Sequence, residues 1–151
     1  MVEDVKSYID EYIPLSPLYI TIHYESFENK KDIEENIKCL KENNIKVGLA
    51  IKPETSERNI YEYLNRINMI LVMTVEPGYG GQKLIPETLE KAKKIKKYIQ
   101  KNNLDCYVQV DGGINLDTIQ DVKTAKVDIA VVGTTIINSK NYNETIKALK
   151  K

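Results

Sequence analysis

The chain has 151 residues, of which 42% are hydrophobic, and its 22 lysines and arginines balance 22 aspartates and glutamates. This composition is typical of one globular domain with ample core, and the charge balance gives no electrostatic basis for binding nucleic acid or a membrane surface. No apolar run has the length of a signal peptide or membrane span, and Cys39 and Cys106 lack metal-site spacing, so we expect a cytoplasmic protein with two reduced thiols.

Hydrophobic periodicity predicts alternating helices and strands along the whole chain. A helical stripe of Val5, Ile9, Tyr12 and Ile13 comes first. Apolar, β-branched runs then predict strands at residues 19–23, 47–51, 69–75, 108–111 and 128–133. Further helices are predicted from the spacing of Ile33, Ile37 and Leu40; of Ile60, Leu64 and Ile67; of Leu89, Ala92, Ile95 and Ile99 after Pro86; of Leu116, Ile119 and Val122 after an Asn115 cap; and of Tyr142, Ile146 and Leu149.

Strand, loop and helix thus recur five times without a linker. This succession predicts a parallel β/α architecture in a single domain over residues 1–151. Because parallel strands end at the same edge of a sheet, the residues that follow each strand should meet there. The lysine-rich run at residues 91–101 is interpreted as the solvated face of its helix.

Three of the predicted strand ends carry glycine clusters. Asp111 is followed by two glycines, the sequence PGYGGQ occupies residues 77–82, and Gly133 precedes two threonines. Each cluster alone is typical of a tight turn. Three at one edge predict backbone N–H groups that face an anion, so we predict a site for a phosphorylated small molecule with Asp111 as its acid–base carboxylate.

The same motifs resemble those of the ribulose-phosphate 3-epimerases. The resemblance is carried by MTVEPGYGGQ at residues 73–82 and VDGGI at residues 110–114, which are highly specific. TIHYE at residues 21–25 and GTTI at residues 133–136 extend it over essentially the whole chain. The resemblance implies interconversion of D-ribulose 5-phosphate and D-xylulose 5-phosphate, a reaction of the pentose phosphate pathway.

The resemblance also implies a fold and a site. It implies a (β/α)₈ barrel of the TIM type, in which two aspartates act on opposite faces of C3 and a divalent metal (zinc, iron, manganese or cobalt) polarises the carbonyl. By resemblance Asp111 is one of the catalytic aspartates and also a metal ligand. Met73 and Met1 correspond to the wall of the substrate pocket. The substrate- and phosphate-binding positions carried over are Gly78, Tyr79, Gly80, Gly81, Asp111, Gly112, Gly113, Gly133 and Thr134.

The chain departs from the family pattern at its start. Met1 resembles the end of the family's third strand, so we expect an N-terminally truncated barrel with about five β/α units. The family's other catalytic aspartate and two metal-binding histidines would lie upstream, and His23 resembles a strand-end residue beside the site. We therefore expect weak or absent metal binding, little or no epimerase activity from this chain alone, and association as a homo-oligomer or through open barrel edges.

Two alternatives to this function stay open. Nothing in the sequence fixes the length of the sugar, so another phosphoketose 3-epimerase, for example one acting on allulose 6-phosphate, is the alternative with the same chemistry. A non-catalytic phosphosugar-binding or interaction fragment is the alternative of a different class. The partner expected in every case is a phosphorylated sugar.

Overall fold

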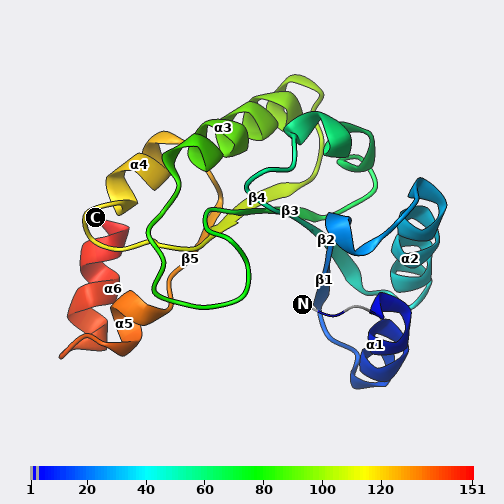
Figure 1. The fold of residues 1–151 in the computed structure, drawn as a ribbon, viewed down its shortest axis with the longest axis horizontal. Coiled ribbons are helices and arrows are strands. Elements are labelled where there is room, and N and C mark those ends of the chain that lie inside the picture. The colour runs from blue at the N-terminus through cyan, green and yellow to red at the C-terminus, as the bar shows by residue number, and fades with distance from the viewer. Residues whose placement is uncertain (1, 3) are drawn as a thin grey trace.

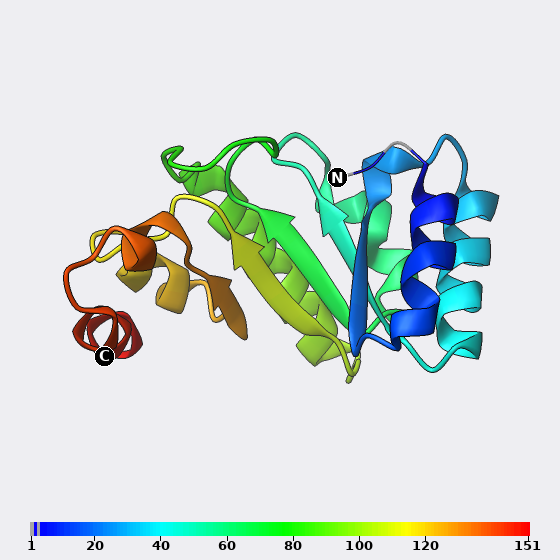
Figure 2. The same cartoon turned by 90° about the horizontal axis from the view of Figure 1, so that it is seen from below.

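A computed structural model describes residue 2 and residues 4–151 and contains one five-stranded sheet. The strands are β1 (Tyr19–His23), β2 (Lys46–Ile51), β3 (Met69–Met73), β4 (Tyr107–Asp111) and β5 (Ile129–Val131), and their order in the sheet follows the chain. All neighbouring strands are parallel, so the five strands end at one edge (Figures 1 and 2). The predicted succession of parallel β/α units is confirmed.

Helices and 3₁₀ turns connect these strands. They are α1 (Val5–Tyr12), η1 (Ile13–Leu15), η2 (Tyr24–Ser26), α2 (Lys30–Glu42), η3 (Glu57–Tyr63), α3 (Pro86–Lys101), α4 (Ile119–Thr124), α5 (Thr134–Ile137) and α6 (Tyr142–Lys150). Figure 1 shows α3 lying along one face of the sheet, where it packs on β3 and β4. Within residues 4–151, none of the helices combines the length and apolar composition that crossing a membrane requires.

The hydrophobic core lies between the sheet and the helices on this face. Alternate strand residues point into it and have no exposed surface: Val47, Leu49, Ile51, Ile70, Val72, Val108 and Val110. The facing stripe of α3 is buried as its spacing predicted, and consists of Leu89, Ala92, Ile95 and Ile99. Burying one such aliphatic side chain contributes about 1.5–3 kcal/mol, so this layer holds the strand ends in fixed register.

The other face of the sheet carries the remaining alternate residues, among them Met73 and Asp111. These two residues are paired in the β3–β4 register and end their strands together. At the far edge, β5 pairs only with β4, and Ile129 and Val131 remain 39% and 37% exposed. The sheet is therefore open, and its least covered strand is β5.

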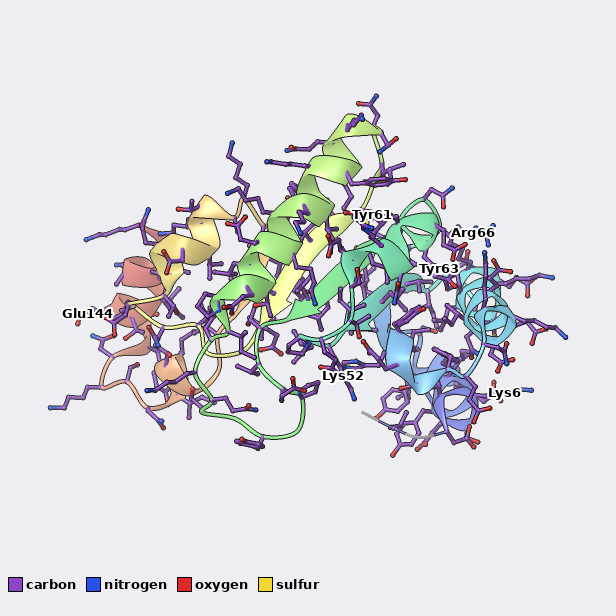
Figure 3. All side chains as sticks on the ribbon, turned by 45° about the horizontal axis from the view of Figure 1, so that its top comes forward. Lys6, Lys52, Tyr61, Tyr63, Arg66 and Glu144 are labelled. Atoms are coloured by element: carbon purple, nitrogen blue, oxygen red, sulfur yellow. The ribbon has the colours of Figure 1, made fainter. Side chains whose placement is uncertain are left out.

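One predicted α-helix is a 3₁₀ helix instead. The connection from β2 to β3 forms η3, which places Ile60 in the core and ends before Leu64 and Ile67. Tyr61 of η3, which Figure 3 labels, stacks on Tyr98 of α3, with ring centroids 4.2 Å apart and an interplanar angle of 3°. The tighter 3₁₀ geometry suits this short connection because it brings the apolar side of η3 onto the core and α3.

The start of α4 also differs from the prediction. Asn115 does not cap the helix, which begins at Ile119. Its side-chain oxygen instead accepts hydrogen bonds from the N–H groups of Asp117 at 2.8 Å and Thr118 at 3.0 Å, which closes a turn before the helix. Leu116, predicted on the buried stripe, is consequently 53% exposed.

Lys91 overturns the interpretation of residues 91–101 as a wholly solvated face. Lys91 is only 9% exposed, and its ammonium donates to the carbonyl oxygens of Lys52 at 3.0 Å and Pro53 at 2.6 Å. Burial lowers the pKa of this ammonium. Lys94 and Lys97 of the same run are exposed as predicted, so the lysines of α3 divide between solvent and a structural contact.

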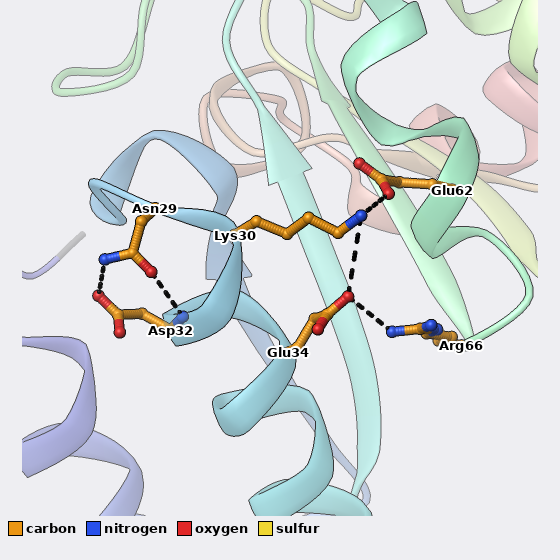
Figure 4. Close-up of polar contacts among 6 residues, drawn as sticks. All are labelled: Asn29, Lys30, Asp32, Glu34, Glu62 and Arg66. Atoms are coloured by element: carbon orange, nitrogen blue, oxygen red, sulfur yellow. Dashed lines mark hydrogen bonds and ion pairs between the residues drawn. The ribbon is translucent and has the colours of Figure 1, made fainter.

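A surface network joins α2 to η3 (Figure 4). Lys30 of α2 bonds to Glu62 of η3, and Glu34 of α2 accepts a hydrogen bond from Arg66 at 2.9 Å. Asn29 caps α2, since its side chain accepts from the N–H of Asp32 at 3.1 Å. These groups are largely exposed, so the ion pairs contribute little to the stability of the fold.

The two cysteines are both unpaired thiols in the structure. Cys106 is buried at the start of β4, and burial raises the pKa of its thiol to about 12. Cys39 is half-buried on α2. A thiol with so high a pKa carries almost no thiolate at neutral pH, so Cys106 is a packing residue.

Candidate active site

Asp111 is the last residue of β4 and lies half-buried at the edge where the strands end. Its backbone is fixed, because the N–H of Thr74 donates to its carbonyl oxygen at 2.8 Å. Burial raises the pKa of its carboxyl group above the ordinary value. A raised pKa makes the carboxylate a better proton acceptor, as a general base requires.

The two glycines after Asp111 bring the backbone into close contact with the neighbouring loop. The hydroxyl of Thr74 donates to the carbonyl of Gly112 at 2.6 Å. Gly112 has φ +123°, and a Cβ there would lie 2.4 Å from a methyl group of Val75. Gly113 has φ +65°, and a Cβ there would lie 2.3 Å from the backbone nitrogen of Leu84. Only glycine fits either position.

The loop between β3 and α3 is held by its own hydrogen bonds. The side-chain amide of Gln82 donates to the carbonyls of Glu76 at 2.6 Å and Tyr79 at 2.9 Å. Gly78 and Gly81 have positive φ angles of 146° and 79°. Tyr79 is 73% exposed, so it contributes backbone more than packed side chain to the loop.

These loops enclose a first cavity of about 340 Å³, which we call the glycine cavity. It is lined by all the residues carried over as substrate- and phosphate-binding, together with Met73, Val75, Glu76, Pro77, Gln82, Ile114 and Val131. Five backbone N–H groups of this lining donate no hydrogen bond within the described turns and loops: those of Gly78, Gly80, Gly81, Gly113 and Gly133. Several backbone donors are therefore available to an anion.

Gly133 and Thr134 reach the glycine cavity from β5. Gly133 precedes the short helix α5, and the hydroxyl of Thr135 donates to the carbonyl of Ile114 at 2.9 Å. This bond ties the segment after β5 to the segment after β4. A Cβ at Gly133 would meet no atom within 4 Å, so the position opens onto space.

A second cavity of about 530 Å³ adjoins the first, and we call it the sheet cavity. It shares Met73, Pro77, Gly78 and Asp111 with the glycine cavity. Most of its remaining wall is apolar or aromatic and comes from α1, β1, β2 and β3: Val2, Val5, Tyr8, Ile9, Tyr12, Tyr19, Ile20, Thr21, Ile22, His23, Ser26, Ala50 and Leu71. Asp111 and Met73 thus stand at the junction of a polar, backbone-lined space and a largely apolar one.

The structure groups nearly all the predicted site residues. Met73 lies at the junction, and the glycine positions and Thr134 surround the first cavity. Met1 lies outside the described residues. The sequence interpretation assigned no role to Glu25 and did not predict the burial of Lys91. The contacts by which these two residues support His23 are described below. A buried lysine inside a lysine-rich helix gives no sequence signal, because its burial depends on the distant loop that receives its ammonium.

The expected metal ligands are not assembled in the described part of the chain. Across residue 2 and residues 4–151, no three histidine, cysteine, aspartate or glutamate side chains are grouped so that they could hold a metal ion. Asp111 stands alone, whereas catalytic metal sites typically use three protein ligands. The donors present therefore do not fit a resident divalent metal, and the chemistry that Asp111 can perform by itself is proton transfer.

Comparison with known sequences matches nearly the whole chain. A sequence model described as the ribulose-phosphate 3 epimerase family matches residues 1–137. The chain is 35% identical over 150 residues to the ribulose-phosphate 3-epimerase of Helicobacter pylori strain J99, which covers 99% of this chain and 68% of that protein. It is 38% identical over 146 residues to the enzyme of that name from Buchnera aphidicola subsp. Baizongia pistaciae, covering 97% and 63%. The chain thus spans 63–68% of the length of these relatives.

Comparison with solved structures shows the fold. A 3-hexulose-6-phosphate synthase superposes with a TM-score of 0.70 at 16% identity, covering 99% of this chain and 69% of that one. A KGPDC from Streptococcus mutans gives 0.65 at 16% identity, covering 98% and 66%. Both neighbours are TIM-barrel enzymes, and the five parallel strands described above correspond to part of such a barrel. The expected fold class, an incomplete (β/α) barrel, is confirmed.

Proposed function

Because this chain belongs to the ribulose-phosphate 3-epimerase family, we propose that it carries the phosphate-binding loops and one acid–base group of an enzyme that interconverts D-ribulose 5-phosphate and D-xylulose 5-phosphate. The observation that carries the proposal is the position of Asp111. Its carboxylate stands where the glycine cavity meets the sheet cavity. A phosphoketose whose phosphate occupies the first space would extend its carbon chain past this carboxylate.

The glycine cavity supports phosphate binding through backbone donors. The N–H groups of Gly78, Gly80, Gly81, Gly113 and Gly133 donate to no acceptor among the described turns and loops. They belong to the three loops that line one cavity. Backbone N–H groups in such a concavity bind an anion without a cationic side chain, which fits a site whose lining residues include no lysine or arginine.

Asp111 supports proton transfer at C3 of the sugar. The C3–H bond of a 2-ketose is adjacent to the carbonyl, so Asp111 can take the proton while the C–H bonding electrons form a C2–C3 double bond. The π electrons of the carbonyl then move onto the C2 oxygen, which gives an ene-diolate. The raised pKa of this carboxyl group suits that role. Returning the proton to C3 regenerates the ketose and the carboxylate, whereas inversion requires delivery of a proton to the opposite face.

Isotope exchange tests this proposal independently of inversion. D-ribulose 5-phosphate and D-xylulose 5-phosphate are each incubated with the chain in D₂O, and the C3–H signal is followed by ¹H NMR. We expect the C3 proton of one epimer to be replaced by deuterium, because Asp111 faces one side of C3 and exchanges its own proton with solvent. Unphosphorylated ribulose is the control and should exchange far more slowly. Binding of the phosphoketose without exchange at C3 of either epimer would contradict the proposal.

We propose further that the chain associates with another chain through the edges of its sheet. We also propose that it is located in the cytoplasm. β1 and β5 each pair with a single neighbour, and β5 is exposed. Unpaired strand edges and exposed apolar side chains favour pairing with another chain. Size-exclusion chromatography with light scattering measures this directly, and a stable monomer over a wide concentration range would contradict association.

A further inference from the structure

His23 ends β1 on the wall of the sheet cavity, which Asp111 also lines. Its side chain is 15% exposed, and its Nδ1 lies 3.2 Å from a carboxylate oxygen of Glu25. Its other ring nitrogen, Nε2, makes no hydrogen bond to any of the described residues. No buried side-chain nitrogen or oxygen of the described residues lacks a hydrogen-bond partner, so Nε2 has exposed surface on a residue that lines the sheet cavity.

Glu25 is itself held by two other groups. Its second carboxylate oxygen accepts hydrogen bonds from the N–H of Lys52, at 2.8 Å, and from the hydroxyl of Thr55. Lys91 of α3 holds the loop that contains Lys52, because its ammonium donates to the carbonyl oxygens of Lys52 and Pro53. Contacts between residues 27–39 positions apart in sequence therefore fix the orientation of one imidazole ring.

This arrangement determines which nitrogen of His23 carries the proton. Burial of Glu25 opposes its ionisation, but the bonds from His23, Lys52 and Thr55 outweigh it and lower the pKa of its carboxyl group to about 2. Glu25 is therefore a carboxylate at neutral pH and can only accept hydrogen bonds. Nδ1 must then carry a proton, and in the neutral ring Nε2 is left as an acceptor.

We propose that His23 contacts the bound phosphoketose, with Nε2 accepting a hydrogen bond from a sugar hydroxyl, and that Glu25 is the positioning residue that holds the ring in this state. The proposal rests on the function proposed above. The phosphate end lies in the glycine cavity and Asp111 stands at the junction. His23 therefore lies on the sugar side of Asp111, where hydroxyl groups would be the polar groups to recognise.

The single histidine makes the test direct, because the imidazole of this chain gives one set of ¹⁵N signals. The full ¹⁵N-labelled chain is titrated with D-ribulose 5-phosphate and, separately, with inorganic phosphate. With the ring neutral, we expect the free protein to show protonated Nδ1 and unprotonated Nε2. Saturation with the phosphosugar should shift the Nε2 signal by several ppm toward the protonated value. Inorganic phosphate should move the glycine amide signals and leave Nε2 in place.

Variants separate ligand contact from structure. His23→Leu and Glu25→Gln should weaken ribulose 5-phosphate binding roughly threefold to tenfold, the range of one hydrogen bond, with unchanged affinity for inorganic phosphate. His23→Gln should recover part of the loss, because its amide oxygen can accept the same hydroxyl. Glu54→Gln is the matched control, since Glu54 is exposed in the loop after β2 that holds Glu25 and makes no bond to His23.

The outcomes distinguish this proposal from the proposed function. Glycine amides that respond to the phosphosugar while Nε2 does not move would overturn the role of His23 and leave phosphoketose binding intact. Equal weakening of phosphate and phosphosugar binding in Glu25→Gln would overturn it too, because it would show a structural effect on the whole site. If neither the glycine amides nor Nε2 respond, the proposed function itself is wrong.

Discussion

The two cavities that meet at Asp111 are built in different ways. The glycine cavity is formed largely by backbone, and its shape depends on positive φ angles and on Gly112 and Gly113, where a Cβ would overlap the neighbouring loop. The sheet cavity is lined by residues of several helices and strands, and its one histidine is oriented through Glu25 and the loop after β2. The first half is therefore encoded in short contiguous motifs, and the second half in contacts between distant parts of the chain.

The largest expected effect lies at the junction of the two cavities. Asp111→Asn should lower the rate of C3 exchange at least about 100-fold, because it removes the proposed general base. It should leave ribulose 5-phosphate binding within a few fold. A raised carboxyl pKa means that the folded state disfavours the ionised form, so this group does not destabilise the fold below its ordinary pKa of 3.8 and destabilises it increasingly as the pH rises from there through the raised pKa. At neutral pH the variant should therefore be at least as stable as the parent chain.

Deuterium exchange and chemical denaturation measure these two quantities. Asp105→Asn is the matched control, since Asp105 is an exposed aspartate next to the other end of β4. Undiminished exchange in Asp111→Asn would show that another group removes the proton.

The next effect separates two glycines of the same cavity. Gly112→Ala should destabilise the fold by about 2–4 kcal/mol, because its Cβ would lie 2.4 Å from Val75 at φ +123°. Gly133→Ala should change stability by less than about 0.5 kcal/mol, since nothing lies within 4 Å of its Cβ. Gly133→Val should also fold but should weaken ribulose 5-phosphate binding about tenfold or more, as its side chain enters the cavity. Urea unfolding and calorimetry make the comparison, and equal destabilisation by both alanines would contradict it.

The sheet cavity should be the more sensitive to acid. The pKa of Glu25 falls from 4.5 to about 2 on folding, so its contribution to stability is present above pH 4.5 and is lost as the pH falls toward 2. This contribution is on the order of 2 kcal/mol after allowance for partial exposure. Unfolding measured from pH 6 to pH 2 should show that Glu25→Gln removes this part of the pH dependence. An unchanged pH dependence in the variant would show that Glu25 does not stabilise the fold as a carboxylate.

The smallest effect should lie outside both cavities. Lys30→Met removes the ion pair of Lys30 with Glu62 and should destabilise the fold only slightly, with the difference shrinking at high salt. Ribulose 5-phosphate binding should be unchanged. A loss of binding in this variant would mean that the α2–η3 surface is coupled to the cavities. It would contradict our expectation that this surface and the cavities are independent.

The same contrast explains how much could be predicted from the sequence. The five strands follow from apolar runs such as that of β3, and the position of Asp111 follows from a strand that ends directly before two glycines. The glycine cavity was predictable because each of its loops is a local motif. The burial of Lys91 was not predictable, since it depends on carbonyls 38 and 39 positions away. Glu25 was missed for the same reason, because its partners Lys52 and Thr55 come from another loop.

The central claim is that one phosphoketose spans both cavities with C3 beside Asp111, and contacts to Met73 test it most directly. Met73 pairs with Asp111 across the sheet and lines both cavities. With ¹³C-methyl methionine in a chain that has three methionines, Met73→Leu identifies the Met73 signal. We predict nuclear Overhauser contacts from this methyl group to the C3 and C4 protons of bound ribulose 5-phosphate, and from the C5 protons to Gly133 and Thr134. Contacts of the C5 protons to His23, or no contact from Met73 to the saturating sugar, would contradict the claim.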